Sequence, residues 1–167
     1  MTPRVTGPAA AGGNAVVIGI GNEFRRDDGA GPAVLARLHG RVPGGVELLV
    51  SDGEPAGLIE AWAGAPLAVI VDAVRAEPSV PGRLHRLVLR EAGMAEVSPV
   101  SSHGLGLDSA IGLARALDRI PGTLILHAVE AADLGQGPGL TPAVAAVIDT
   151  LAGAVLHDLN SQGSEPG

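Results

Sequence analysis

Acidic residues follow four apolar runs of this chain. Asp28, Asp52, Asp72 and Glu130 each stand a short distance beyond such a run, and His103, in the stretch SSHG, adds an imidazole. Carboxylate oxygens and imidazole nitrogens bind divalent cations or transfer protons. The residue types therefore indicate a site for cation binding or acid–base chemistry, provided that the fold brings them together.

Three chemistries fit these residues. Two carboxylates and one imidazole, from Asp28, Asp72 and His103, would suit a divalent transition metal with open coordination positions. Ligation by oxygen alone would favour Ca²⁺ or Mg²⁺. Two of the acids could instead activate a water molecule as a general acid–base pair. The spacing is compatible with all three.

Several of these residues also have purely structural interpretations. Asp27 is expected to cap or support the following helix, and Asp52, before a glycine, could be an ordinary turn residue. Asp72 ends a strongly apolar segment, where an ionised carboxylate needs a partner or a cleft. Ser101 and Ser102 are interpreted as helix caps, since a serine next in sequence to a histidine rarely has triad geometry and the chain has no G-x-S-x-G motif.

The remaining histidines are expected to be structural or superficial. His127 lies inside a predicted strand and is expected in the core or at a sheet edge. The other three are interpreted as surface residues: His39, His85 and His157.

Composition narrows the chemistry further. The chain contains no Cys, and all 11 of its basic residues are Arg. Thiolate nucleophiles, zinc–thiolate sites and catalytic lysines are therefore excluded. The net charge of −7 argues against partners such as nucleic acid or an anionic membrane. We find neither an apolar run near the ~20 residues of a membrane span nor a secretory signal, and we expect a cytoplasmic protein.

The glycines of GIGNEFRRDDGAG resemble those of a dinucleotide-binding loop. The third glycine of that fingerprint would stand at residue 24, which is Phe24. Asp27 and Asp28 would in addition repel a pyrophosphate. Dinucleotide binding is therefore not expected.

Strands and helices are predicted to alternate along one domain, residues 14–159, between a disordered N-terminal segment, residues 1–13, and a disordered tail, residues 160–167. The predicted strands are Ala15–Ile20, Val46–Val50, Leu67–Val71, Arg83–Leu89 (an exposed edge strand) and Thr123–Val129. The first predicted helix begins between Asp28 and Pro32 and ends at His39. The other predicted helices are Leu58–Ala63 (with Trp62 facing the core), Asp108–Leu117 and Pro142–Leu159.

This alternation predicts an α/β fold with a mostly parallel sheet between helices. The carboxyl ends of parallel strands meet at one edge, which is where open α/β sheets bind ligands. We therefore expect the acids to converge there.

The motifs resemble, in order, those of the [NiFe]-hydrogenase maturation proteases. They are GIGNEFRRDDGAG, SDGEPAG, VDAV, PGRL, SSHGLGL and GPGLTPAV, which together cover about residues 15–158. The resemblance implies a three-layer α/β/α sandwich around a five-stranded, twisted sheet, similar to phosphorylase/hydrolase-like folds. It also implies an endopeptidase that removes a C-terminal extension from the hydrogenase large-subunit precursor after nickel insertion.

The same resemblance implies roles for particular residues. Asp28, Asp72 and His103 would recognise nickel held by the substrate, so that no metal is permanently bound, although Zn or Cd could bind in vitro. Asp28, Asp52 and Asp72 are the predicted catalytic residues, with Asp28 or Asp52 as the base that assists attack by water. Cleavage would be of the aspartyl type or metal-assisted. We expect a monomer whose partner is the precursor.

Two other activities remain open from the sequence. The chain could be an assembly chaperone that senses nickel without cutting, or a metal-dependent amidase or hydrolase on the same fold. Four residues differ from those of some or most family members. Asp28 stands where some members have Glu, Glu54 would add a carboxylate to the rim of the cleft, Pro55 would stiffen its loop, and His127 stands where a small residue is frequent.

Overall fold

The computed structural model describes residues 14–90, 93–94 and 107–163. Its strands are β1 (Val16–Ile20), β2 (Glu47–Ser51), β3 (Leu67–Val74), β4 (Leu84–Arg90), β5 (Gly93–Met94) and β6 (Thr123–Glu130). Its helices are the 3-10 helix η1 (Arg26–Gly29), α1 (Ala30–Leu38), α2 (Pro55–Trp62), α3 (Asp108–Ala116), α4 (Pro142–Ala145) and α5 (Ile148–Gly163).

The strands form one mixed sheet in the order β2-β1-β3-β6-β4-β5. Four strands, β2, β1, β3 and β6, are parallel, and β4 pairs antiparallel with β6. This confirms the mostly parallel sheet. The two-residue strand β5 extends the predicted five strands to six.

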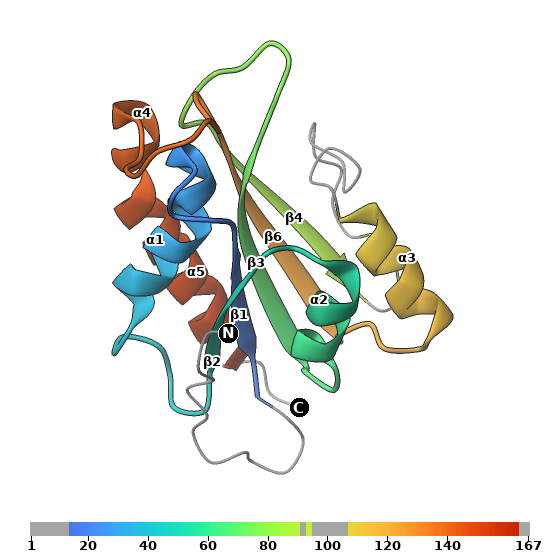
Figure 1. Ribbon diagram of the computed structural model, residues 1–167. Helices are drawn as coiled ribbons and strands as arrows, with labels where there is room; N and C mark the ends of the chain where they lie inside the picture. The colour runs from blue at the N-terminus through green and yellow to red at the C-terminus, as the bar shows by residue number, and fades with distance from the viewer. Residues whose placement is uncertain (1–13, 91–92, 95–106, 164–167) are drawn as a thin grey trace.

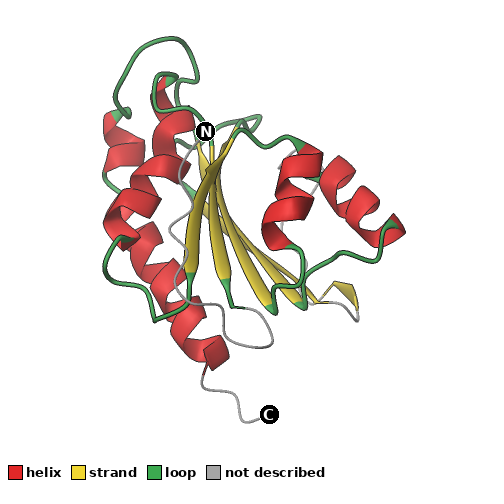
Figure 2. Cartoon of the chain, turned by 60° about the horizontal axis from the view of Figure 1, so that its bottom comes forward, coloured by secondary structure: helices red, strands yellow, loops and turns green. Residues whose placement is uncertain are grey.

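Helices cover both faces of the sheet and make three layers (Figure 1). Helices α1, α4 and α5 lie on one face, and α2 and α3 lie on the other (Figures 1 and 2). Each interface has its own apolar cluster: Leu38, Val69 and Val155 belong to the first, and Ile70 and Trp62 to the second. Trp62 faces the core as predicted, and its indole N–H donates to the Arg119 carbonyl at 3.0 Å.

Some predicted boundaries and environments are different. Strand β5 pairs with β4 only at Leu89 and Arg90, so the rest of β4 lies at the edge of the described sheet, as predicted. The strand is not exposed, however, because Leu87, Val88 and Leu89 are buried in it. The predicted C-terminal helix is divided into α4 and α5, and α5 continues to Gly163, past the tail boundary placed at residue 160. The other predicted disordered residues lie outside the described residues.

The segment Pro142–Ser161 is long and apolar enough to span a membrane by length and composition, contrary to our expectation. Its helices nevertheless bury Leu151, Val155 and Leu159 in the apolar cluster shared with α1 and the sheet. Asp158, on the same helix, is also buried, in an ion pair with Arg86. These contacts are those of a core helix in a folded domain.

Candidate active site

The carboxyl ends of the parallel strands meet at one edge of the sheet, as predicted. Ile20 at the end of β1 pairs with Ser51 at the end of β2, and Gly19 pairs with Val71 of β3. Asp52 follows Ser51, and Asp72 follows Val71. The sheet register therefore brings residues from distant parts of the sequence to a common edge.

The turn after β1 folds Asp28 back over the end of that strand. Gly21 has φ +135°, and a Cβ at this position would lie 1.8 Å from the Asp28 carbonyl oxygen, so only glycine fits. The backbone N–H of Asn22 donates to Asp28 Oδ2 at 2.9 Å. A Cβ on Gly31 would lie 2.8 Å from the Val71 carbonyl oxygen, so α1 begins directly against the strand ends. The glycines thus allow the close approach that places the Asp28 carboxylate.

Asp72 is half-buried and adjoins Asp28. Burial is the main cause that raises the pKa of Asp72 to about 8; the hydrogen bond from the Ala73 N–H opposes this shift, and the Asp28 carboxylate makes a smaller contribution to it. A buried carboxyl group with a raised pKa beside a second carboxylate is stabilised by a proton or a cation. Asp28 and Asp72 are therefore near enough to interact electrostatically, and their roles in catalysis and metal recognition stay predictions.

Asp52 is exposed at the same edge and has a turn role. Its Oδ1 accepts the Glu54 N–H at 2.9 Å, and Gly53 between them has φ +88°. The structural interpretation of Asp52 as a turn residue therefore holds, and its catalytic role stays a prediction.

His103, Ser101 and Ser102 lie outside the described residues. Within the described ranges, no group of three His, Asp or Glu side chains is close enough to hold a metal ion. The three-residue nickel set therefore stays a prediction.

Asp27 is a support residue, and it does not cap a helix. Its buried carboxylate accepts hydrogen bonds from the N–H groups of Ala132, Asp133 and Thr141 at 2.8 to 3.1 Å, and from the Thr141 hydroxyl. Burial alone would raise the pKa of Asp27, but these hydrogen bonds outweigh it and hold the pKa below its ordinary value. Asp27 thereby ties the loop after β1 to the loop after β6.

Glu130 does not join the edge acids, although it ends a parallel strand. It is 2% exposed, accepts the Val80 N–H at 3.0 Å, and lies 2.7 Å from His85 Nε2. The hydrogen bond from Val80 is the main cause that lowers the pKa of Glu130, with His85 and Arg83 adding to it. His85 is accordingly half-buried, which corrects its assignment to the surface.

Two further side chains have structural partners that the sequence did not indicate. Glu54 caps α2 by accepting the Ala56 and Gly57 N–H groups, so its carboxylate is engaged with the helix. His127 is buried as predicted, and its Nε2 lies 2.6 Å from Oδ2 of Asp158, which also accepts from Arg86. No spacing signal relates Asp158 to a strand 31 residues earlier in the chain.

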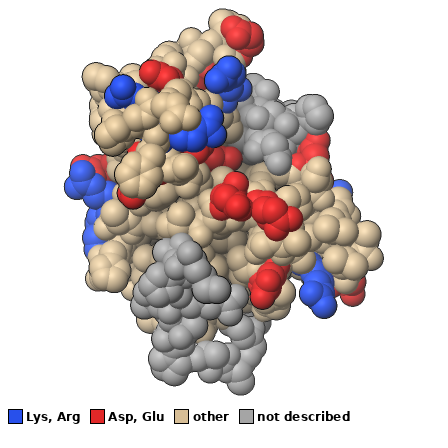
Figure 3. All heavy atoms as spheres, viewed as in Figure 1, with Lys and Arg blue, Asp and Glu red and all other residues tan. Residues whose placement is uncertain are grey.

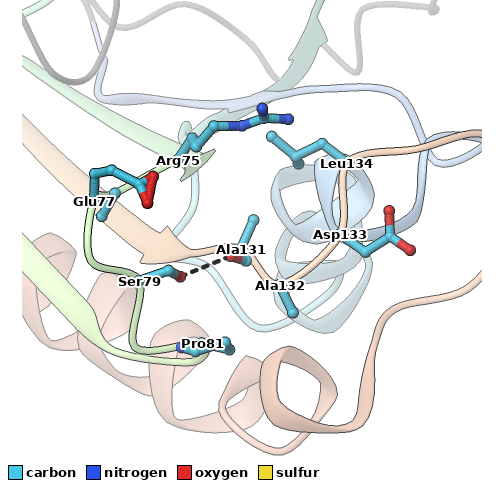
Figure 4. Close-up of a pocket in the computed structure, with 9 residues that line it drawn as sticks. Arg75, Glu77, Ser79, Pro81, Ala131, Ala132, Asp133 and Leu134 are labelled. Atoms are coloured by element: carbon cyan, nitrogen blue, oxygen red, sulfur yellow. Dashed lines mark hydrogen bonds between the residues drawn. The ribbon is translucent and has the colours of Figure 1, made fainter.

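A polar pocket of about 260 Å³ lies beyond the ends of β3 and β6. Figure 4 shows its side chains, with Ser79 Oγ donating to the Ala131 carbonyl at 3.1 Å. Arg75, Glu77 and Asp133 supply charges of both signs.

On the face seen in Figure 3, acidic side chains gather near the middle, which favours approach of a cation over an anion.

Comparison with known proteins identifies the family. The sequence model of the hydrogenase maturation protease (HycI) family matches residues 41–158. The chain is also 31% identical over 154 residues to the hydrogenase 2 maturation protease of Escherichia coli (strain K12), covering 90% of this chain and 93% of that protein. The chain belongs to the hydrogenase maturation protease family.

Solved structures agree with this assignment. The hydrogenase maturating endopeptidase HybD from E. coli superposes with a TM-score of 0.75 at 28% identity, covering 90% of this chain and 94% of the other. A hydrogenase 2 maturation peptidase from Thaumarchaeota archaeon SCGC_AB-539-E09 gives a TM-score of 0.66 at 25% identity, with 87% and 97% covered. This hydrogenase maturation protease is therefore a peptidase with the three-layer α/β fold of its relatives, which carries out its chemistry without cysteine or lysine.

Proposed function

We propose that this protease removes the C-terminal extension of a [NiFe]-hydrogenase large-subunit precursor after nickel insertion, by recognising the nickel that the precursor holds. The observation that carries the proposal is the Asp28–Asp72 pair at the carboxyl edge of the sheet. A cation between the two carboxylates would offset their mutual repulsion and the cost of burying Asp72.

In this proposal the metal arrives with the substrate. Asp28 and Asp72, together with His103, would contact the nickel, and the precursor would supply the other ligands. The enzyme would then hold no permanent metal of its own, and cleavage would depend on the metal state of the substrate. Zn or Cd could occupy the same side chains in vitro.

The chemical step is peptide hydrolysis. A carboxylate, Asp28 or Asp52, would accept a proton from the attacking water, and a proton would pass to the departing amine. Asp52 is exposed and accepts the Glu54 N–H through Oδ1, so that, among the described residues, Oδ2 has no hydrogen bond that would compete with such a role. The partner is the precursor, and we infer a cytoplasmic monomer.

The deciding experiment compares nickel-loaded with nickel-free precursor, using mass spectrometry to detect loss of the extension. We expect cleavage of the loaded form only. Equal cleavage of both forms would contradict nickel recognition, and binding of the loaded form with no change in mass would indicate a non-cleaving chaperone. Hydrolysis of unrelated amides by an enzyme with its own metal would indicate a different hydrolase.

A chelator distinguishes metal on the substrate from metal on the enzyme. Enzyme that is treated with chelator and then dialysed should process loaded precursor at its original rate, whereas treated precursor should resist cleavage. Permanent loss of enzyme activity would show a resident metal and contradict this part of the proposal.

A further inference from the structure

A second feature adjoins the acid pair: an apolar groove of about 390 Å³ between the start of α1 and the loop after β6. Pro32, Ala33 and Ala36 of α1 form one wall, and Pro138 and Leu140 form another. Ala33 and Ala36 lie about one helical turn apart, so their methyl groups share a face. Their small size leaves the helix surface open to an apolar side chain.

Phe24 stands at this groove with its side chain 63% exposed. It is the only Phe in a chain whose other large aromatic residue, Trp62, is fully buried. An exposed aromatic ring gains no burial free energy in the isolated protein. Aromatic residues that stay exposed beside an apolar hollow are typical anchors of protein interfaces.

The backbone of Phe24 is fixed even though its ring is exposed. Its N–H donates to Asn22 Oδ1 at 2.9 Å, and its carbonyl accepts the Gly137 N–H at 2.8 Å. Arg25 and Arg26 extend this connection by donating to carbonyl groups of the loop after β6. A ring presented by a backbone held at both ends loses little entropy on binding.

The same turn joins the groove to the acid pair. Asn22, whose side chain holds Phe24, donates its N–H to Asp28, and Gly29 lines the groove directly after Asp28. Buried Asp27 fixes the loop that carries Pro138 and Leu140 to this turn. The groove and Asp28 therefore belong to the same turn, with Phe24 and Gly29 on either side of Asp28 in the sequence.

We propose that the Phe24 groove is the docking surface for an apolar segment of the large-subunit precursor, with a precursor side chain inserted between the Phe24 ring and the alanine face of α1. The inference rests on the proposed function for the identity of the partner. The groove would hold the precursor while its nickel-bearing part meets the acid pair.

The test uses two groove variants, Phe24→Ala and Ala36→Arg, with nickel-loaded precursor as the probe. Ala36 is exposed and arginine is a good helix former, so the substitution should fill the groove without unfolding α1. Matched controls on the opposite layer are Leu113→Ala and Ala116→Arg, since both residues are exposed on α3. We expect KM to rise about ten-fold in each groove variant with kcat unchanged, and the controls to match the wild type.

Several results would overturn the docking proposal. One is an unchanged KM in both groove variants while wild-type enzyme cleaves normally, in which case the proposed function survives. Another is a wild-type dimer in sedimentation that Ala36→Arg converts to monomer, because the groove would then bind a second copy. If the wild type binds precursor without cleaving it and Phe24→Ala weakens that binding, docking stands and the proposed function fails. A wild type that neither binds nor cleaves overturns both.

Discussion

Two groups of acids in this protease have opposite surroundings. The edge pair consists of Asp28, in the turn after β1, and Asp72, near the end of β3; the two acids interact electrostatically, and burial raises the pKa of Asp72 to about 8. Glu130 and Asp158, the paired acids, lie beside β4, β6 and α5 with histidine and arginine partners.

The difference teaches how to separate functional from structural carboxylates. Hydrogen bonds and positive charges hold the pKa of both paired acids below its ordinary value, even though burial opposes this at both. The carboxylate oxygens of both paired acids are already bonded to groups of the fold. At Asp72, burial outweighs the opposing hydrogen bond from the Ala73 N–H, which is a pattern typical of functional carboxylates.

The largest expected effect is on activity at the edge pair. Asp72→Asn should lower processing of nickel-loaded precursor by about 100-fold or more, and Asp28→Asn and His103→Ala should act similarly. The melting temperature at neutral pH should not fall and should rise, because Asn removes the ionisation cost that burial imposes on Asp72. Asp118→Asn, which alters an exposed acid after α3, is the matched control. Normal cleavage by Asp72→Asn would show that the edge pair is not the functional group of acids.

The paired acids should show the converse pattern. Asp158→Asn should destabilise the protein by about 3 kcal/mol, because His127 and Arg86 lose a buried partner. Urea unfolding measures this change, and kcat per folded molecule should be retained. If Asp158→Asn kept full stability and lost activity, Asp158 would be a functional acid and not a structural one.

Lowering the pH should remove the stabilisation that Glu130 and Asp158 give to the folded protein. The folded pKa values of Glu130 and Asp158 lie below the unfolded values, which are about 4. Their stabilisation is therefore complete above that range and is lost as the pH falls through the folded values, where the unfolded chain binds more protons.

The melting temperature measured from pH 7 to pH 3 should accordingly fall, and Glu130→Gln should flatten the decline. An identical decline in that variant would show that Glu130 does not contribute.

The smallest effect is expected at the helix cap near Asp52. Glu54→Ala should cost about 1 kcal/mol of unfolding free energy, because the Ala56 and Gly57 N–H groups lose their acceptor. As a comparison, Arg37→Ala removes an exposed ion pair with Asp149 and should cost less than about 0.5 kcal/mol. A change in KM without loss of stability in Glu54→Ala would assign Glu54 to the substrate-binding rim instead.

Sequence patterns predicted the alternating elements and the common edge, because buried strands and amphipathic helices have distinct periodicities. They did not separate Glu130 from Asp72. Each acid stands at or near the carboxyl end of a buried parallel strand, and only the antiparallel neighbour β4, with Arg83 directly before it, brings His85 and Arg83 to Glu130. The groove at Phe24 was missed for a similar reason, since it combines residues more than a hundred positions apart.

The sequence by itself determined the α/β class, the absence of thiol and lysine chemistry, and the acids that end the strands. These properties follow from residue type and local periodicity. Only the tertiary structure decided which acids have partners, because partners such as His127 and Asp158 meet through sheet register and helix packing. It also decided that the turn GIGNEFRRDDGAG does three things: Asp27 secures a loop, Asp28 meets Asp72, and Phe24 is left exposed beside a groove.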